Sequence, residues 1–339
     1  MRTYSLEKLE KWILWAGIIS LAIFIPYSGF IQDLPYIYQL MPFFISMIFL
    51  GLPHGAMDHL VPSRLSNLNV RKSVTDVSVL YALAGGLYTL WWFIDALTAF
   101  IFFIIMTWLH WGQGDLYAVK KLGKTDYLKT KTDKALLILV RGGIPMLVPL
   151  LAYPGLYERF ATSVLSLFSE NINYSLIFSE ASRKYVFLLI GSLTVLNAVI
   201  SFLRAYDYDS LSQWRYNQFE IIFLWIFFFS LPPVFAIGLY FCLWHSLRHI
   251  ARLSLIDSEG MMEDLENGDY RQYIENLVRD TAPLTLLSLV IIGIISLFMP
   301  GSIGNSESLI AVYLVGISVL TLPHFIIVSW MDHREGIWA

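Results

Sequence analysis

Histidine is the residue type in this chain best suited to metal chemistry, and its positions are unusual. Six of the seven histidines lie in long apolar stretches or at their ends: His54, His59, His110, His245, His249 and His324. An ionisable group inside a membrane is costly, and it usually faces the interior of a helix bundle or a water-filled cavity. A single membrane histidine often only forms a hydrogen bond between helices. Six of them favour a shared metal site.

His245 and His249 lie four residues apart in the segment 244–249 (WHSLRH). On a helix this spacing places both imidazoles on one face, one turn apart, which is how one helix supplies two ligands to one metal. The pattern is common by chance, so its weight comes from the other histidines. Arg248, between the two, is expected to face away from them, toward lipid headgroups or an acidic partner.

The segment 51–59 (GLPHGAMDH) is more distinctive. His54 and Asp58 are four residues apart and can share a helix face, whereas His59 is rotated by about 140° from His54 on a regular helix. Both histidines can therefore bind one metal only if the neighbouring proline or glycine distorts the helix. Asp58 is either a carboxylate that orients a metal-binding histidine or a helix-end group at the membrane interface.

Two further histidines complete the candidate site. His110 lies in the segment 107–115 (TWLHWGQGD), where two glycines permit a close approach between helices. Gln113 and Asp115 can accept hydrogen bonds from histidine rings or face water at a helix end. His324 follows a proline, as His54 does. We expect His324 to support the site or to pack against it, rather than to bind the metal as a fifth ligand.

The type of metal is less restricted by the sequence. Imidazole suits Zn, Cu, Fe and Ni, so ligand type alone does not choose among them. The only cysteine, Cys242, lies in an apolar stretch, which excludes an iron–sulfur cluster or a thiolate zinc site within this chain. Di-iron membrane hydroxylases and desaturases use more histidines, in several boxes. A single mononuclear centre therefore fits the six candidates better.

The elements that must position these histidines are membrane helices. The chain has 339 residues, of which 57% are hydrophobic and 14% charged, whereas a soluble domain usually carries about 25% charged residues. A helix needs roughly 20 mainly apolar residues to cross the hydrocarbon core. We therefore predict an all-α fold, a polytopic helix bundle that forms one integral membrane domain over residues 1–339. The ten predicted spans are 12–31, 37–60, 74–94, 96–117, 135–155, 184–203, 218–231, 233–252, 281–299 and 308–330.

Lysines and arginines in the short loops predict the orientation. The amino-terminal segment and the loops after the second and fourth spans are basic, whereas the loops after the first and third contain Asp33 and Asp95 and almost no basic residue. Both termini are therefore predicted to be cytoplasmic, in a multi-pass protein of the cell membrane. The histidine-bearing spans are all even-numbered. They are expected to run in the same direction and to place the six histidines at a similar depth.

Three segments depart from a regular pattern. The sequence Leu231-Pro232-Pro233 divides a long apolar stretch, and because proline breaks helices we favour two helices over one kinked helix. The fifth span contains two glycines and two prolines, so it is expected to be bent or interrupted. Residues 253–280 mix acidic and basic side chains and are expected to form a short amphipathic cytoplasmic stretch.

The sequence resembles the Brp/Blh family of β-carotene 15,15′-dioxygenases. The resemblance rests on residues 51–58 (GLPHGAMD), 108–112 (WLHWG) and 244–249 (WHSLRH), and the order, spacing and hydrophobic surroundings agree over most of the chain. It implies a non-haem Fe(II) enzyme that uses O₂ to split β-carotene at its central 15,15′ double bond into two all-trans-retinal molecules. It also suggests a functional link to a retinal-binding opsin.

The resemblance assigns roles to individual residues. The four iron-binding histidines of the family correspond to His54, His110, His245 and His249. His59 and His324 lie outside that set and are expected to support the site, as Asp58 is, although the resemblance carries no role over to His59. A substrate that dissolves in lipid favours a site that opens sideways into the bilayer.

Aromatic residues make up 16% of the chain and can line a polyene tunnel or stabilise a cationic intermediate. We expect interfacial belts and lipid-facing bulk to account for most of them. The tryptophans in question are Trp91, Trp92, Trp108, Trp111, Trp225 and Trp244.

Other functions use the same residue types. A metal or proton transporter also places histidine and aspartate inside a membrane, but it often contains inverted repeats, and this sequence has none. A membrane lipid hydroxylase or desaturase is a second alternative. A non-catalytic carotenoid- or retinal-binding partner of an opsin is a third, although no span has the mid-depth lysine that a retinal Schiff base requires. The net charge of −3 and the scattered basic residues argue against a nucleic-acid partner.

Overall fold

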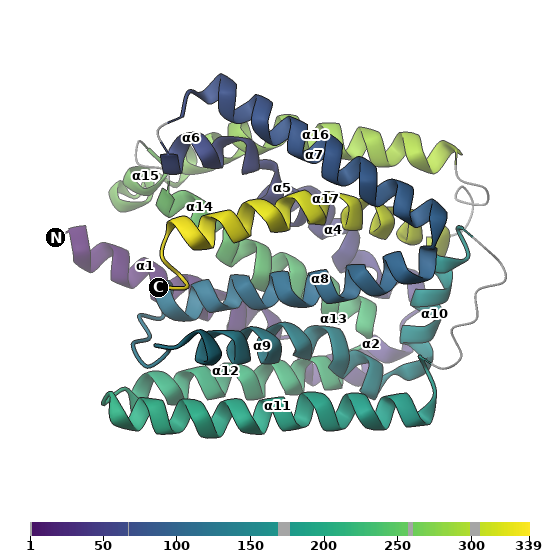
Figure 1. Ribbon diagram of the computed structural model, residues 1–339, viewed down its shortest axis with the longest axis horizontal. Coiled ribbons are helices and arrows are strands. Elements are labelled where there is room, and N and C mark those ends of the chain that lie inside the picture. The colour runs from purple at the N-terminus through teal and green to yellow at the C-terminus, as the bar shows by residue number, and fades with distance from the viewer. Residues whose placement is uncertain (1, 67, 169–176, 257–259, 299–305) are drawn as a thin grey trace.

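The computed structural model of the protein is a bundle of helices that run roughly along one direction (Figure 1). It describes residues 2–66, 68–168, 177–256, 260–298 and 306–339, and no strand occurs within these ranges. Nine helical segments of this part of the chain are long and apolar enough to cross a membrane. The predicted all-α, polytopic class is therefore confirmed.

The helices follow one another with short connections. Four of the elements are not α-helical: η1 and η2 are 3₁₀ turns, and η3 and η4 are π-helical turns. In chain order the elements are α1 (Arg2–Ala22), η1 (Ile25–Tyr27), α2 (Ser28–Asp33), α3 (Tyr36–Gln39), α4 (Met41–Phe49), α5 (Gly51–Ala56), η2 (Asp58–Leu60), α6 (Val61–Ser66), α7 (Val70–Ile94), α8 (Ala96–Tyr117), η3 (Ala118–Leu122), α9 (Lys131–Ala152), α10 (Pro154–Leu165), α11 (Glu180–Asp207), α12 (Leu211–Ser230), α13 (Pro233–Tyr240), η4 (Phe241–Ser246), α14 (Leu247–Ile256), α15 (Met261–Asn267), α16 (Tyr270–Phe298) and α17 (Ser306–Arg334).

The difference between ten predicted spans and nine candidate spans lies in α12. This helix has 20 residues and packs on α9 and α11, but its first half is polar (LSQWRYNQFE), so it is not apolar enough over its whole length. It ends at Ser230, and α13 begins at Pro233. The predicted break into two helices is therefore confirmed, because two consecutive prolines remove the backbone donors that a continuous helix would need.

The fifth predicted span was expected to be bent or interrupted. Helix α9 is continuous although it contains Pro145 and Pro149, so it is not interrupted. Its glycines serve close packing instead. A Cβ atom added at Gly142 would lie 1.9 Å from the carbonyl oxygen of Trp108 and 2.8 Å from the backbone nitrogen of Gly112. Helices α8 and α9 are thus in direct backbone contact, which only small residues allow.

The four segments that carry the membrane histidines run the same way, as predicted. Lys120, in η3 directly after α8, donates to a carbonyl of the C-terminal tail at 2.9 Å. Arg252 near the end of α14 pairs with Glu335 at 2.5 Å, and Arg334 donates to Ser66 at the end of α6 at 2.7 Å. The ends of α6, α8, α14 and α17 therefore meet. Helix α1 begins at this same end of the bundle (Figure 1), and its assignment to the cytoplasm stays a prediction.

The predicted amphipathic stretch 253–280 contains the end of α14, the short helix α15 and the first turns of α16, and residues 257–259 lie outside the described residues. Met261 is buried, whereas Arg271 and Glu275 form an exposed pair at 2.7 Å. The last residue of the predicted span 281–299 also lies outside the described residues.

Candidate metal centre

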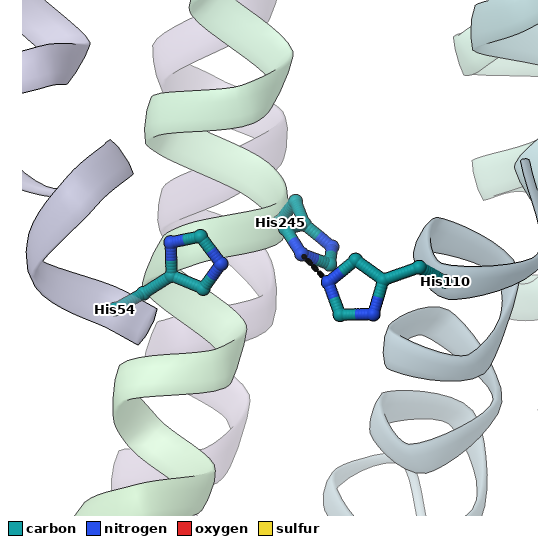
Figure 2. A group of neighbouring side chains, drawn as sticks. All are labelled: His54, His110 and His245. Atoms are coloured by element: carbon teal, nitrogen blue, oxygen red, sulfur yellow. Dashed lines mark hydrogen bonds between the residues drawn. The ribbon is translucent and has the colours of Figure 1, made fainter. Parts of the chain in front are cut away.

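Five buried imidazole rings meet inside the bundle, each from a different element. They belong to His54 on α5, His110 on α8, His245 on η4, His249 on α14 and His324 on α17, and none is more than 6% exposed. Figure 2 shows the rings of His54, His110 and His245 pointing toward one another. The structure therefore brings together five of the six histidines that hydropathy singled out.

The distances between ring nitrogens fit a shared metal ion. One ligand atom from each of His54, His110 and His245 lies within 4.8 Å of the others. The Nε2 atoms of His110 and His245 are 3.1 Å apart. Two nitrogens that each lie about 2.1 Å from one ion are separated by about 3.0 to 3.4 Å when the bond angle is between about 90° and 110°. The pair already has the spacing of two ligands on one ion.

Several of these ring nitrogens form no hydrogen bond within the described part of the chain. Among the described residues, no hydrogen-bond partner reaches the buried Nε2 atoms of His54, His249 and His324 or the Nδ1 atom of His110. A buried polar atom without a partner costs about 1–3 kcal/mol. Converging neutral imidazoles are good metal ligands, so a metal ion would satisfy the Nε2 atoms that the protein leaves without a partner. The residues present fit a metal centre.

The local structure around His54 explains its orientation. A non-helical residue separates α4 from α5, Pro53 lies in the first turn of α5, and this helix already ends at Ala56. The Nδ1 atom of His54 hydrogen-bonds to the carbonyl of Gly51, which leaves Nε2 facing the other rings. His59 does not join them, because its Nδ1 atom hydrogen-bonds to a carbonyl of the preceding turn at 2.9 Å. The helix is interrupted between the two histidines, but the distortion does not bring both of them to one point.

His245 lies in η4, a π-helical turn, and π-helical turns are frequent at functional sites. The rings of His245 and His249 are stacked, with centroids 6.5 Å apart and planes inclined by 10°. The two rings therefore share one face of the helix, which confirms the prediction from their spacing.

Arg248 faces away from the two histidines into a buried ion cluster. Its guanidinium contacts Asp115 at 3.1 Å and Glu220 at 2.6 Å, and Arg141 contacts the same two carboxylates at 3.1 and 2.7 Å. All four side chains are at most 3% exposed. Arg248 was expected to face either lipid headgroups or an acidic partner, and these contacts confirm the acidic partner. Arginine forms two contacts to a carboxylate pair, so burial of all four charges is compensated within the cluster.

The ion cluster connects the helices that carry histidines. Trp244 donates to Asp115 at 2.9 Å, and the Arg248 guanidinium lies 3.7 Å from the centre of the Trp244 ring. Gln113 donates to Ser329 on α17 at 3.1 Å. The polar residues after His110 thus join α8 to η4, α14 and α17. The sequence contained a signal for this cluster, since Arg141 lies in an apolar stretch of α9, Glu220 directly precedes the apolar half of α12, and intramembrane charges usually find partners.

Asp58 and His324 lie in direct contact. The Nδ1 atom of His324 is 2.8 Å from Oδ2 of Asp58, and one ligand atom from each of Asp58, His249 and His324 lies within 4.8 Å of the others. Of the two readings of Asp58, the orienting carboxylate fits this buried contact and the interfacial group does not.

An apolar cavity of about 590 Å³ reaches the histidine cluster, and this volume is in the range of small-molecule sites. His54, His110 and His324 form part of its wall. Its outer side is formed by α7 and α16, where Leu287 and Ile291 line the cavity although they are 51% and 45% exposed. These two helices lie on one side of the bundle (Figure 1). The cavity thus opens between α7 and α16 toward the side of the bundle, where the helix surfaces are apolar.

Few of the aromatic residues named from the sequence line this cavity. Of the six tryptophans, Trp111 alone is part of its described wall. Trp108 donates to a carbonyl of α9 at 2.8 Å, and Trp244 belongs to the ion cluster. The lipid-facing or interfacial position expected for most of the six does not hold for Trp92, Trp111 and Trp244, which are buried, and Trp91 alone is exposed.

Comparisons with known proteins agree on one family. The family model of β-carotene 15,15′-dioxygenase matches residues 45–332. A probable β-carotene 15,15′-dioxygenase Blh of Halobacterium salinarum is 37% identical over 297 residues, which cover 87% of this chain and 85% of that protein. A probable β-carotene 15,15′-dioxygenase Brp of the same species is 27% identical and covers 87% of this chain and 84% of that protein.

A β-carotene 15,15′-dioxygenase from an uncultured marine bacterium is 23% identical over 292 residues, which cover 84% of this chain and 91% of that protein. No solved structure matches. The match to the family model, over residues 45–332, includes the segments that carry all five buried histidines. This chain belongs to the β-carotene 15,15′-dioxygenase family.

Proposed function

We propose that this chain uses O₂ to cleave β-carotene at its central 15,15′ double bond into two all-trans-retinal molecules, with Fe(II) held by His54, His110, His245 and His249. The observation that carries the proposal is the cluster of buried imidazoles at the wall of an apolar, laterally open cavity. The reaction is the one named for the relatives of this chain. The four ligands are those that the resemblance to the family implies.

The protein would hold the metal with neutral imidazoles, and in His54 the second ring nitrogen is fixed by a hydrogen bond. His54 is oriented by the carbonyl of Gly51, and His245 and His249 are oriented by the helix that the ion cluster anchors. When bound, iron supplies the activation of O₂, which zinc does not supply because it has no redox chemistry. Second contacts of this kind fix the tautomer and the direction of each ring.

The cavity explains how a polyene would reach the histidines. His54 and His110 line it, so the substrate approaches from their side of the cluster. Phe103, Trp111 and Phe241 are also part of the wall, and apolar and aromatic walls suit a hydrocarbon chain. The long substrate places its central double bond near the cluster, while its ends extend toward α10 and toward the opening between α7 and α16.

The opening also fits the source of the substrate. β-Carotene dissolves in the hydrocarbon core, and lateral entry lets it move from lipid into the cavity without crossing water. The exposed lining residues Leu287 and Ile291 are apolar, as residues that face lipid must be. We place the protein in the cell membrane with both termini in the cytoplasm, where its product would be available to a retinal-binding opsin.

The proposal is tested by expressing the chain in cells that make β-carotene and measuring retinal. The wild-type chain is expected to form retinal, the variant His245→Ala to form none, and the variant His333→Ala to form wild-type amounts. His333 is the matched control, because its side chain is exposed near the end of α17 and lies outside both the cluster and the described wall of the cavity. Unchanged β-carotene without retinal, in cells that contain folded, iron-loaded wild-type protein, would overturn the proposal.

A further inference from the structure

His324 lies among the four histidines of the proposed iron site, on a helix from which the family motifs take no ligand. Its ring centroid is 4.8 Å from that of His110, 4.9 Å from that of His54 and 5.1 Å from that of His249. The side chain is 4% exposed. The ring of His324 therefore lies as close to the other imidazoles of the cluster as the four proposed ligands lie to one another.

The two nitrogens of His324 have different surroundings. Nδ1 is 2.8 Å from Oδ2 of Asp58, whereas the buried Nε2 has no hydrogen-bond partner among the described residues. A carboxylate that accepts from Nδ1–H leaves the lone pair on Nε2. Metal-binding histidines commonly have this arrangement, because the carboxylate fixes the tautomer and makes the ring a stronger ligand.

Asp58 is itself held in place. The Tyr81 hydroxyl, on α7, donates to the same Oδ2 atom at 2.6 Å, and Asp58 is 1% exposed. Asp58 and His324 come from segments 266 residues apart in the chain, so the contact depends on the packing of η2 against α17. A buried carboxylate with two donors is costly to place in a membrane unless it has a function or a charged partner.

We propose that His324 is a fifth imidazole ligand of the metal, with Asp58 and Tyr81 as positioning residues. This inference rests on the proposed function, since it concerns the same metal ion. It differs from the expectation from the sequence, which gave His324 a supporting or packing role. It also assigns Asp58, His249 and His324 to the same centre as the other three histidines, rather than to a second metal ion.

The test measures metal binding rather than activity. Purified wild-type protein and variants are loaded with Fe(II) and dialysed against a graded series of chelator concentrations, and iron per chain is determined by mass spectrometry. Asp58→Asn is expected to weaken iron binding about 10–100-fold, the usual effect of losing such a carboxylate. Tyr81→Phe should weaken it less, and His324→Gly more than either. His59→Ala is the matched control and should bind iron as the wild type does.

Added imidazole distinguishes a ligand from a packed side chain. His324 lines the cavity, so free imidazole can enter the space that His324→Gly leaves and restore iron binding. The proposal predicts this rescue, and it predicts one iron per wild-type chain. Undiminished iron binding by His324→Gly, lost binding that imidazole does not restore, or two irons per wild-type chain would overturn it. Wild-type protein that binds no iron would instead refute the proposed function.

Discussion

Replacing Gly142 by alanine tests whether close packing of α8 against α9 positions His110. The added Cβ atom would lie 1.9 Å from the Trp108 carbonyl oxygen, whereas ordinary van der Waals contact begins near 3.4 Å. Both nearest partners are backbone atoms, so a side-chain rotation cannot relieve the clash. The two helices must separate by about 1.5 Å at this level.

The size of this shift decides the expected effect. His110 lies between the two backbone contacts of Gly142, at Trp108 and Gly112, so its ring must move with α8. A functional site tolerates displacements of about 0.5 Å, and a misplacement of 1 Å can lower a rate about 100-fold. We therefore expect Gly142→Ala to lose at least 100-fold in retinal formation. Overpacking should also destabilise the protein by about 1–3 kcal/mol.

The assay compares three proteins in the same detergent. Retinal formation, iron per chain and thermal unfolding are measured for the wild type, Gly142→Ala and the matched control Gly191→Ala. A Cβ atom at Gly191, on the neighbouring helix α11, would meet nothing within 4 Å, and alanine favours helix over glycine by about 1 kcal/mol. The control should be unchanged or slightly more stable. If Gly142→Ala retains iron and activity at wild-type levels, the packing argument is refuted.

Three further predictions follow from the same structure. Arg141→Met should destabilise the protein by about 3–5 kcal/mol in thermal unfolding, because it leaves two buried carboxylates with one cation. The control Lys72→Met removes an exposed pair with Asp76 and should cost at most about 1 kcal/mol in the same measurement. Gly86→Trp should fill the cavity mouth and lower retinal formation about tenfold or more with iron per chain unchanged, whereas Gly191→Trp on the outer surface should not. Chelation should abolish activity, and added Fe(II) but not Zn(II) should restore it; full activity of chelated or zinc-loaded protein would contradict this.

Much of the arrangement can be predicted from hydropathy and charge. The spans of the histidine-bearing helices follow from apolar length, and their common direction follows from their even numbering, as the contacts of Arg252 and Arg334 at one end confirm. The pair His245 and His249 follows from helical spacing alone. Each of these features depends on local sequence or on the number of membrane crossings that precede it. They can therefore be predicted without knowing how the helices pack.

The rest depends on how helices pack. His324 and Asp58 are far apart in the chain, and their contact exists only because α17 lies beside η2. Arg141 and Glu220 are recognisable as intramembrane charges, but their pairing with Asp115 and Arg248 requires α8, α9, α12 and α14 to meet. A hydropathy profile shows the depth of a residue and not the neighbour that its helix will have.

The lining of the cavity could not be predicted for a related reason. The outer part of the cavity lies between small residues of α7, such as Ala82 and Gly86, and larger side chains of α16, such as Leu287 and Ile291. The aromatic content of the sequence allowed for a tunnel wall without saying which side chains form it, and Trp111 alone of the six tryptophans contributes to the described wall. Which aromatic side chains surround a ligand is set by the relative rotation of each helix about its axis.

The central claim is that this membrane chain splits β-carotene symmetrically with iron bound at the buried histidines. The most direct measurement follows β-carotene consumed and retinal formed in one sample of purified protein, with iron per chain determined in the same sample. The account predicts two retinal molecules for each β-carotene consumed, with a rate proportional to the iron content. Products of unequal length, or retinal formation that continues unchanged in iron-free protein, would contradict it.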